Sequence, residues 1–575
     1  MVKTRACGRG GFLIPSAVLA GVLVDELRRA GLKHAVLAPG SRSAPLALAL
    51  HTETCITVHV VIDERSAAFM ALGIARATRA PALVLCTSGT AAANFHPAVI
   101  EAEQARVPLL VVTADRPEEL RATGANQTID QTRLYGAAVR FFAEIDAPHD
   151  SSGKEAPRWR SVVGQAYAAA VGSPMGPVHL NVAFREPLVE PGGEPAAVAL
   201  AGRQEGRAWT EAVVAPRRPS PELAAGLAGE IAAVERGLII AGDCDLDPGP
   251  VVELAAKSGW PLLAEPTSGA RRGPNAITTF DALLRHQPFA GAHRPELVLR
   301  LGKPGLSRAL AGMLSPEVPQ VLVERDGVRL DPERALSRII VSDEALLCEA
   351  LCERLELREE SPWLRSWREA EEAARAAVDD VLDSDDSPTE PRVARDLAAL
   401  VPDGGVLVAA SSMPIRDLNS FMAARRGSRV LGNRGASGID GFVSSAVGVA
   451  LVSPGRTYAL AGDLSLLHDQ NGLIGRGDVD LALVVLNNDG GGIFSLLPQA
   501  GLGSGFEELF GTPHGLDLAA LARLYGLDYR RLERAGDLAA AISGEGPTLI
   551  EVRTERAANA QLHHRLWAAV AAALG

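Results

Sequence analysis

The sequence predicts an α/β protein built from three doubly wound domains, each with a parallel sheet. Three observations lead to this expectation. The chain has 575 residues, which is more than one hydrophobic core usually serves. Short apolar runs alternate with helix-like stretches along most of its length. Polar, glycine-rich motifs follow the ends of these runs, where parallel sheets present their ligand-binding loops.

The first part of the chain carries four such runs, each followed by a turn signal and a helix-like stretch. They are rich in Val, Leu and Ile and cover 34–39, 56–63, 81–87 and 107–115. Continuously apolar strands that alternate with helices are typical of a parallel sheet covered on both faces. A helix is expected ahead of them, capped by Ser16 at its start and ending before Gly31.

The same pattern predicts two further sheets. It recurs at 406–410, 457–461, 481–486 and 548–553, and more weakly at 238–242, 297–301 and 320–324. Two intervening stretches, 191–222 and 379–392, read as linkers, because they combine proline with glycine or charge and are poor core material. We therefore expect domains over 1–190, 191–385 and 386–575.

Composition excludes some classes of function. The hydrophobic fraction of 47% and charged fraction of 22% are ordinary for a globular protein. The net charge of -12 argues against a nucleic-acid-binding face. The apolar stretch 11–24 is too short to cross a bilayer, so no membrane span is expected. The six cysteines form no CxxC pair and read as buried apolar residues in a reducing compartment, which predicts a cytoplasmic protein.

Polar motifs gather at the predicted ligand edge of the first and last sheets. In the first domain they are PGSRS (39–43), DER (63–65), TSGT (87–90) and ADRP (114–117). In the last they are SSMPIRD (411–417), NRGASGID (433–440), GDLS (462–465) and NNDGGG (487–492). The middle domain offers only AGDCD (241–245) and LGKPG (301–305), without a GxGxxG fingerprint. Ligand chemistry is therefore expected in the first and last domains.

Asp463 and Asn488 each follow a predicted strand in the last domain, and Gly490 to Gly492 come next. A carboxylate, an amide oxygen and a backbone carbonyl are ligands that a hard cation prefers. Glycines let a diphosphate approach the backbone closely. On residue types alone, a metal site is the weaker of two interpretations, because an Asp after a strand is more often a helix N-cap.

GDLS followed by VVLNNDGGG resembles the signature of thiamine-diphosphate-dependent enzymes. In that family the Asp, the second Asn and a backbone carbonyl two residues further hold a magnesium ion. The resemblance places these ligands at Asp463, Asn488 and Gly490, for Mg²⁺ or Mn²⁺ in its place. The spacing between Asp and Asn is slightly short here. Leu464 also stands where most members of the family have glycine.

The resemblance gives a catalytic role to Glu64. In the family, a buried glutamate at the end of a strand hydrogen-bonds the aminopyrimidine ring of the cofactor and promotes the tautomer that removes the C2 proton. Glu64 follows an apolar run and precedes an apolar helix, as such a glutamate should. Residue type alone favours a surface glutamate paired with Arg65.

Longer strings resemble one subfamily, the 2-succinyl-5-enolpyruvyl-6-hydroxy-3-cyclohexene-1-carboxylate (SEPHCHC) synthases of menaquinone biosynthesis. They are APGSRSAPLALAL, DERSAAFMALGIARAT, CTSGTAAANFHPAVIEA, VTADRPEEL, GANQTIDQ, SSMPIRDLN, NRGASGID and NNDGGGIFSLLP. The resemblance implies decarboxylation of 2-oxoglutarate and addition of the resulting carbanion to isochorismate. Two alternatives are another thiamine-diphosphate enzyme, such as a 2-oxoacid decarboxylase or an acetohydroxyacid synthase, and a catalytically inactive regulatory protein of the same fold. Intact Glu64, Asp463 and Asn488 argue against the second.

Four arginines lie on the predicted ligand edges: Arg42, Arg116, Arg416 and Arg434. A guanidinium group binds carboxylates through two parallel hydrogen bonds, and the implied substrates carry several carboxylates. A single loop arginine is more often solvated or salt-bridged, but four on the same edges favour substrate binding. Whether Arg308 of the middle domain also contacts substrate stays open.

The resemblance implies the remaining site residues and the assembly. Cofactor contacts are implied for Pro39, Thr87, Ser412, Met413, Ile439, Gly462, Leu464, Ser465 and Ile493. Substrate contacts are implied for Ser41, Asn126, Gln127, Phe494 and Leu497. No histidine lies in a motif loop, and His96 and His468 are expected to be structural. Relatives place the cofactor between two subunits, so a homodimer or homotetramer with intersubunit sites is expected.

Overall fold

The computed structural model describes residues 14–189, 202–244, 247–303, 305–328, 330–425, 427–503 and 505–575. Part of the predicted linker 191–222 therefore lies outside the described residues. The chain forms two compact units, Met1–Val214 and Ala215–Gly575, called here the N-terminal and C-terminal units.

The N-terminal unit is built around a six-stranded sheet in the order β2-β1-β3-β4-β6-β5, parallel throughout. The strands are β1 His34–Leu37, β2 Thr57–Val60, β3 Ala82–Cys86, β4 Leu109–Asp115, β5 Phe142–Ile145 and β6 Val178–Ala183. The helices are α1 Pro15–Ala30, α2 Ala44–Thr52, α3 Glu64–Thr78, α4 Thr90–Asn94, α5 His96–Ala105 and α6 Ala156–Val171. The four apolar runs predicted here all contain a strand.

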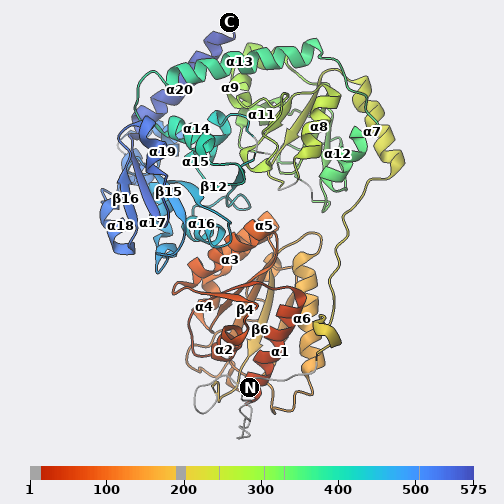
Figure 1. Ribbon diagram of the computed structural model, residues 1–575, viewed down its shortest axis with the longest axis vertical. Helices are drawn as coiled ribbons and strands as arrows, with labels where there is room; N and C mark the ends of the chain where they lie inside the picture. The colour runs from red at the N-terminus through yellow and green to blue at the C-terminus, as the bar shows by residue number, and fades with distance from the viewer. Residues whose placement is uncertain are drawn as a thin grey trace, which may run out of the picture. The chain divides into compact units, whose positions relative to one another are not determined.

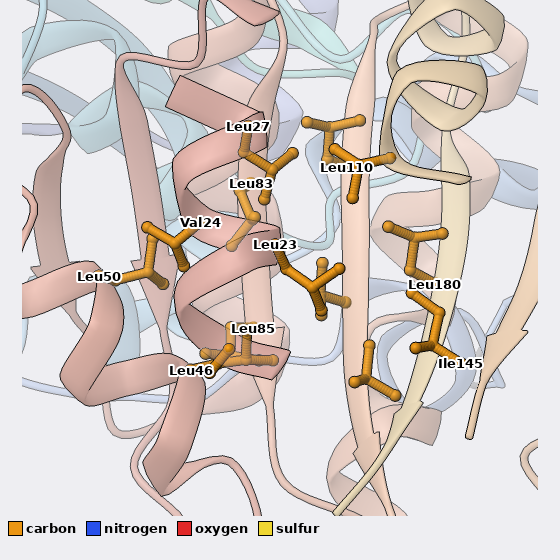
Figure 2. Packing of buried hydrophobic residues seen from close by; sticks show 14 of the residues in the cluster. Leu23, Val24, Leu27, Leu46, Leu50, Leu83, Leu85, Leu110, Ile145 and Leu180 are labelled. Atoms are coloured by element: carbon orange, nitrogen blue, oxygen red, sulfur yellow. The ribbon is translucent and has the colours of Figure 1, made fainter. Parts of the chain in front are cut away.

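One face of this sheet packs against α1, α2 and α6. Figure 2 shows Leu23 and Leu27 of α1 over the sheet residues Leu83, Leu85 and Leu110. All five side chains are buried. Burying a leucine side chain stabilises the fold by about 1.5–3 kcal/mol, so this layer accounts for the apolar residues on one face of the strands.

The first helix begins two residues earlier than expected. Its first residue is Pro15, and Ile14 occupies the N-cap position. Ser16 therefore lies inside the helix, where its Oγ donates a hydrogen bond to the Arg185 carbonyl oxygen at 2.7 Å. Proline is favoured in the first helical turn because its missing N–H would be unpaired there anyway. The predicted end is confirmed, since Gly31 caps the helix at φ 108°.

The run 56–63 differs from the expected apolar strand because β2 lies at the edge of the sheet. Its residues are exposed or half-buried, and Val60 and Ile62 keep 54% and 69% of their surface exposed. Within this unit the segment before Glu64 therefore leaves an apolar surface uncovered.

The C-terminal unit contains two parallel sheets. The five-stranded sheet has the order β11-β10-β9-β7-β8, and the six-stranded sheet has the order β13-β12-β14-β15-β17-β16. When the strands of each sheet are numbered along the chain, the six-stranded sheet of this unit has the same strand order as the sheet of the N-terminal unit. The predicted fold class is thereby confirmed: three parallel sheets with helices (Figure 1).

The element bounds of this unit are as follows. The strands are β7 Gly237–Ala241, β8 Leu262–Ala264, β9 Leu297–Leu301, β10 Gln320–Val323, β11 Arg338–Ile340, β12 Val406–Ala409, β13 Arg429–Leu431, β14 Thr457–Gly462, β15 Leu481–Asn487, β16 Asp528–Arg531 and β17 Thr548–Arg553. The helices around the first sheet are α7 Pro221–Ala233, α8 Gly249–Ser258, α9 Phe280–Arg285, α10 Gln287–Ala292, α11 Arg308–Met313, α12 Glu344–Cys352 and α13 Pro362–Leu382. Those around the second are α14 Glu390–Leu400, α15 Met413–Phe421, α16 Phe442–Ala450, α17 Asp463–His468, α18 Leu518–Tyr525, α19 Leu538–Ala541 and α20 Arg556–Ala573.

The long helix α13 joins the two halves of this unit. It meets the C-terminal helix α20 (Figure 1), and one buried apolar cluster contains Trp363 and Trp367 of α13 together with Leu566 and Val570 of α20. Phe421 of α15 belongs to the same cluster. Helices from both halves of the unit therefore share one core.

Half of the expected linker 379–392 is helical. The helix α13 continues to Leu382 and α14 begins at Glu390, so only 383–389 lies between helices. Glu390 is 1% exposed, contrary to the expectation of poor core material. The charges in this segment suggested that it is solvated, but the buried Glu390 carboxylate accepts hydrogen bonds from Asn488 and Thr554.

The cysteine expectation holds in part. Cys86, Cys348 and Cys352 are buried, whereas Cys55 is exposed and Cys244 is half-buried. Cys7 lies outside the described residues. None of the helices described here is both long enough and apolar enough to cross a membrane.

Candidate active site

Three motif loops of the N-terminal unit meet beyond the carboxyl ends of β1, β3 and β4. Gly40 lies so close to Thr87 that a Cβ atom at this position would come 2.3 Å from the Thr87 Cβ. The Ser88 Oγ donates to the Gln127 carbonyl at 3.1 Å, and the Gln127 Nε2 donates back to the Ser88 carbonyl at 3.1 Å. The segments around 40, 88 and 127 thus form one surface.

Two of the predicted arginines lie close together on this surface. Arg42 is buried, donates from Nη1 to the Phe184 carbonyl at 2.9 Å and forms an ion pair with Glu186 at 3.3 Å. Arg116 donates to the Asn126 carbonyl at 2.8 Å and to the Ser88 Oγ. Burial, with the nearby charge of Arg116, lowers the pKa of Arg42. Two neighbouring positive charges favour an anionic ligand here.

A buried hydrogen-bond network supports these loops from the sheet. The Gln131 side chain accepts from the Gly89 N–H at 2.9 Å and donates to the Asn181 Oδ1 at 2.9 Å. Asn181 donates to Asp115 at 2.8 Å and accepts from the Thr113 hydroxyl at 2.8 Å. Since Asp115 directly precedes Arg116 and accepts its backbone N–H, the network holds both loops.

Glu64 is the first residue of α3, directly after Asp63, which caps that helix by accepting the Ser66 N–H at 3.1 Å. Its side chain is half-buried, not buried as expected. Among the described residues we find no hydrogen bond or ion pair for the Glu64 carboxylate. The pairing with Arg65 that residue type alone favours is therefore not formed. Burial, reinforced by the charge of Glu64, raises the pKa of the nearby Cys86 thiol.

Pro39 and Ser41 are exposed in the loop after β1, and Asn126 and Gln127 are exposed next to Arg116. Thr87 is buried at the end of β3. The predicted residues of this unit thus share one edge of the sheet.

In the C-terminal unit, Asp463 lies at the end of β14 and is 1% exposed. One carboxylate oxygen accepts the Leu464 N–H at 2.7 Å, and the other accepts the Gly490 N–H at 2.9 Å. The His514 Nε2 lies 3.2 Å from the second oxygen. Burial raises the pKa of Asp463, and these hydrogen bonds oppose the shift.

The two asparagines after β15 have different surroundings. Asn487 donates to Glu551 at 2.6 Å and accepts the Asp489 N–H at 3.2 Å, so both ends of its amide are used. Asn488 donates from Nδ2 to Glu390 at 2.9 Å, whereas its Oδ1 is buried without a hydrogen-bond donor. A buried unpaired acceptor is rare, and a bound cation is one explanation.

These atoms can hold a hard divalent cation. Asp463 offers a carboxylate, Asn488 an unpaired amide oxygen, and Gly490 a carbonyl that accepts one hydrogen bond, from Gly492 at 3.0 Å. Such a donor set of mixed oxygens fits Mg²⁺. No group of three or more His, Cys, Asp or Glu side chains suited to a metal occurs among the residues the structure describes, so a purely ionisable ligand set is not formed there.

Two glycines keep this corner open. Gly490 has φ 135°, and a Cβ atom there would lie 1.8 Å from the Gly511 carbonyl oxygen. At Gly492 a Cβ atom would lie 2.5 Å from the Asn488 Nδ2. A side chain at either position would displace the asparagine or the backbone around it.

The segment after β12 carries backbone strain. Ser412, at the N-cap of α15, has φ 74° and ψ -133°. A non-glycine residue in this conformation costs about 1–3 kcal/mol, and such strain concentrates at functional sites. It places Met413 and Arg416 in the first turns of α15, at the ligand edge of the sheet.

A cavity of about 190 Å³ lies beside this helix. Its lining includes Met413, Arg416, Ile493 and Leu497 from the predicted set, together with Arg308. The pKa of Arg416 is lowered by its burial and by the positive charges of Arg434 and Arg308. Three guanidinium groups therefore converge near one cavity, which suits a ligand with several carboxylates.

The other predicted residues of this unit are less closely tied to that cavity. Ser412, Ile439 and Phe494 stand outside its described lining. Gly462 and Leu464 are half-buried and Ser465 is buried; they flank Asp463 in the turn between β14 and α17.

Three residues of the site were not predicted. Lys303, from the LGKPG motif, donates to the Arg434 and Gly435 carbonyls at 2.8 Å each and so holds the loop that carries Arg434. His514 contacts Asp463, and Glu390 contacts Asn488. The LGKPG motif was recognisable, but nothing in the sequence identified its partner loop.

Comparisons with known proteins follow the same division of the chain. Residues 18–134 match the thiamine pyrophosphate enzyme N-terminal TPP binding domain, and 414–552 match the C-terminal TPP binding domain. Residues 229–408 match the middle domain of thiamine pyrophosphate enzymes.

Curated relatives match along nearly the whole chain. A 2-succinyl-5-enolpyruvyl-6-hydroxy-3-cyclohexene-1-carboxylate synthase from Thermobifida fusca is 52% identical over 97% of this chain and 100% of its own length. Proteins of the same name from Myxococcus xanthus and Geobacillus kaustophilus are 44% and 42% identical. These alignments cover 97% and 96% of this chain, and 97% and 98% of the respective relatives. The chain therefore belongs to the SEPHCHC synthase family of thiamine pyrophosphate enzymes.

Proposed function

We propose that this protein is a cytoplasmic SEPHCHC synthase of menaquinone biosynthesis, which decarboxylates 2-oxoglutarate and adds the resulting carbanion to isochorismate. The names of its relatives support the activity. One observation of the structure carries the choice of substrates: the guanidinium groups of Arg308, Arg416 and Arg434 converge near one cavity. Substrates with several carboxylates suit this arrangement.

We assign the cofactor and metal to the residues described above. Asp463, Asn488 and the Gly490 carbonyl would hold Mg²⁺, or Mn²⁺, against the diphosphate. When bound, thiamine diphosphate supplies the electron sink for decarboxylation. The Glu64 carboxyl group, which has no other partner among the described residues, would share a proton with a ring nitrogen of the aminopyrimidine. The contacts proposed to position the cofactor are Pro39, Thr87, Ser412, Met413, Ile439, Gly462, Leu464, Ser465 and Ile493.

The substrate contacts follow from charge and shape. Arg42, Arg116, Arg416 and Arg434 would bind carboxylates, and Ser41, Asn126 and Gln127 would supply neutral hydrogen bonds. Phe494 and Leu497 would form an apolar wall that excludes water. Arg308 joins this set, because it lines the same cavity as Arg416.

We further propose three domains: 1–190 for the pyrimidine, 191–385 as the central domain, and 386–575 for the diphosphate and metal. The active unit is proposed to be a homodimer or homotetramer whose sites combine two chains. The exposed apolar side chains of Val60 and Ile62, next to Glu64, support this assembly.

The direct test is a product assay. The protein is incubated with isochorismate, 2-oxoglutarate, thiamine diphosphate and Mg²⁺, and the products are identified by mass. We expect SEPHCHC and CO2, and no SEPHCHC when isochorismate is omitted. Turnover of pyruvate to a hydroxyacid product, with isochorismate left unconsumed, would instead identify another carboligase of this family.

A further inference from the structure

We infer that Glu390 fixes the amide of Asn488 so that its oxygen, and not its nitrogen, faces the metal position. Glu390 is therefore a positioning residue for the metal ligand. The inference rests on the metal site of the proposed function, and it concerns a residue that sequence reasoning placed in a linker.

Glu390 is placed with little freedom. It is the first residue of α14 and is 1% exposed. Its Oε1 accepts a hydrogen bond from the Asn488 Nδ2 at 2.9 Å and another from the Thr554 Oγ1 at 2.8 Å. Thr554 directly follows β17, and Asn488 directly follows β15, which pairs with β17. One carboxylate oxygen thus links α14 to two neighbouring strand ends.

An asparagine amide has an oxygen end and a nitrogen end of similar size, and only hydrogen bonding distinguishes them. The Glu390 Oε1 accepts from two donors, so the end of Asn488 that faces it must be the NH2 group. A proton on the other carboxyl oxygen would not change this, because Oε1 would still accept both bonds. The Asn488 Oδ1 is then turned away from Glu390, and it is the buried atom that lacks a donor.

The neighbouring asparagine shows the contrast. Glu551 also accepts from the Asn487 Nδ2 and is fully buried. The Asn487 Oδ1, however, is used by the Asp489 N–H at 3.2 Å. Buried glutamates therefore orient both amides, but only Asn488 keeps its oxygen available. Loss of an outer residue that orients a metal ligand typically weakens metal affinity by about tenfold to a hundredfold.

The test measures binding of Mn²⁺ to the full-length protein with thiamine diphosphate, through the electron paramagnetic resonance signal of free Mn²⁺. Glu390→Met removes the acceptor, whereas Glu390→Gln keeps an oxygen that can accept. Glu344→Met is the matched control. Glu344 is also buried and is the first residue of α12, but it pairs with Arg325, after β10, at 2.9 Å. Thermal unfolding of each variant without metal reports folding.

We expect Glu390→Met to bind Mn²⁺ about ten to a hundred times more weakly, and Glu390→Gln and Glu344→Met to bind within about threefold of the wild type. Wild-type affinity in Glu390→Met, with weak binding in Asn488→Ala, would overturn the inference and leave the metal site standing. Wild-type affinity in Asn488→Ala would instead refute the metal site itself.

A second variant covers the case in which Glu390→Met unfolds. Asn488→Asp presents an oxygen in either orientation and needs no partner to orient it. It would also lie beside the Glu390 carboxylate, so removal of Glu390 should relieve repulsion. We expect Asn488→Asp combined with Glu390→Gln to bind Mn²⁺ more tightly than Asn488→Asp alone. Weaker binding in this double variant would contradict an orienting role.

Discussion

His179 should make the N-terminal unit less stable in acid. This histidine is the second residue of β6, is fully buried, and its Nε2 is 2.7 Å from the Thr113 hydroxyl. Its ring contacts Tyr135 and Phe142, with centroids 4.7 and 5.2 Å away. Burial lowers its pKa from 6.5 to about 3. Below pH 6.5 the unfolded chain therefore binds a proton that the folded protein does not.

The sign and size of the effect follow from this difference. The free energy of unfolding keeps its full value above pH 6.5 and falls as the pH drops towards 3. One pKa unit corresponds to about 1.4 kcal/mol, so between pH 7.5 and pH 5 the loss amounts to about 2 kcal/mol. The glutamine in His179→Gln stays neutral and can still hydrogen-bond Thr113. Whatever the stability of this variant at pH 7.5, its free energy of unfolding should not show this loss on acidification.

Hydrogen exchange with mass spectrometry can measure the opening free energy of peptides from Val178–Ala183 at both pH values, after correction for intrinsic exchange rates. Between pH 7.5 and pH 5, the opening free energy of the wild type should fall by about 2 kcal/mol relative to that of His179→Gln. His51→Gln, at an exposed position, is the control and should show no shift. An equal loss on acidification in wild type and His179→Gln would refute the reasoning.

Three further predictions concern the proposed reaction. Glu64→Gln should keep the fold and cofactor binding but lose most turnover, because a carboxamide cannot share the proton that activates the ring; near-normal turnover would rule out this role. Arg416→Ala and Arg434→Ala should each lower kcat/KM for substrate by about tenfold to a hundredfold, the worth of a charged hydrogen bond, with cofactor affinity little changed. The matched control Arg416→Lys keeps the charge without the planar fork and should lose less. Finally, co-expression of Glu64→Gln and Asp463→Ala chains should restore about a quarter of wild-type activity, because half the dimers are mixed and each mixed dimer has one intact site of two. No rescue in verified mixed dimers would exclude a site shared between chains.

The sequence predicted the sheets well and their edges poorly. Each predicted apolar run overlaps a strand, and all of these strands except β2 lie inside a sheet, where they are buried on both faces and need continuous apolar residues. Edge strands such as β5 and β16 carry half-buried or exposed residues and give no such signal. The buried strand β6 was missed for another reason. His179 and Asn181 interrupt its apolar pattern, and only the structure shows that they hydrogen-bond Thr113 and Asp115.

The site was predictable where a motif carries the chemistry itself. Asp463 and Asn488 were identified from GD and NN, and the structure brings both to one corner. Residues that act on those ligands could not be found in this way. Glu390 is far from Asn488 in the chain and lies in a charged, proline-containing segment typical of a linker. Its burial depends on the packing of α14, which a local pattern does not report.

The central claim is that Asp463 and Asn488 hold a metal that anchors thiamine diphosphate. Calorimetric titration of thiamine diphosphate into the full-length protein, with Mg²⁺ or with a chelator, tests it most directly. We expect binding with Mg²⁺, little binding with the chelator, and in Asp463→Ala a weakened affinity that excess Mg²⁺ partly restores. Equal affinity in wild type and Asp463→Ala, with and without the metal, would contradict the claim.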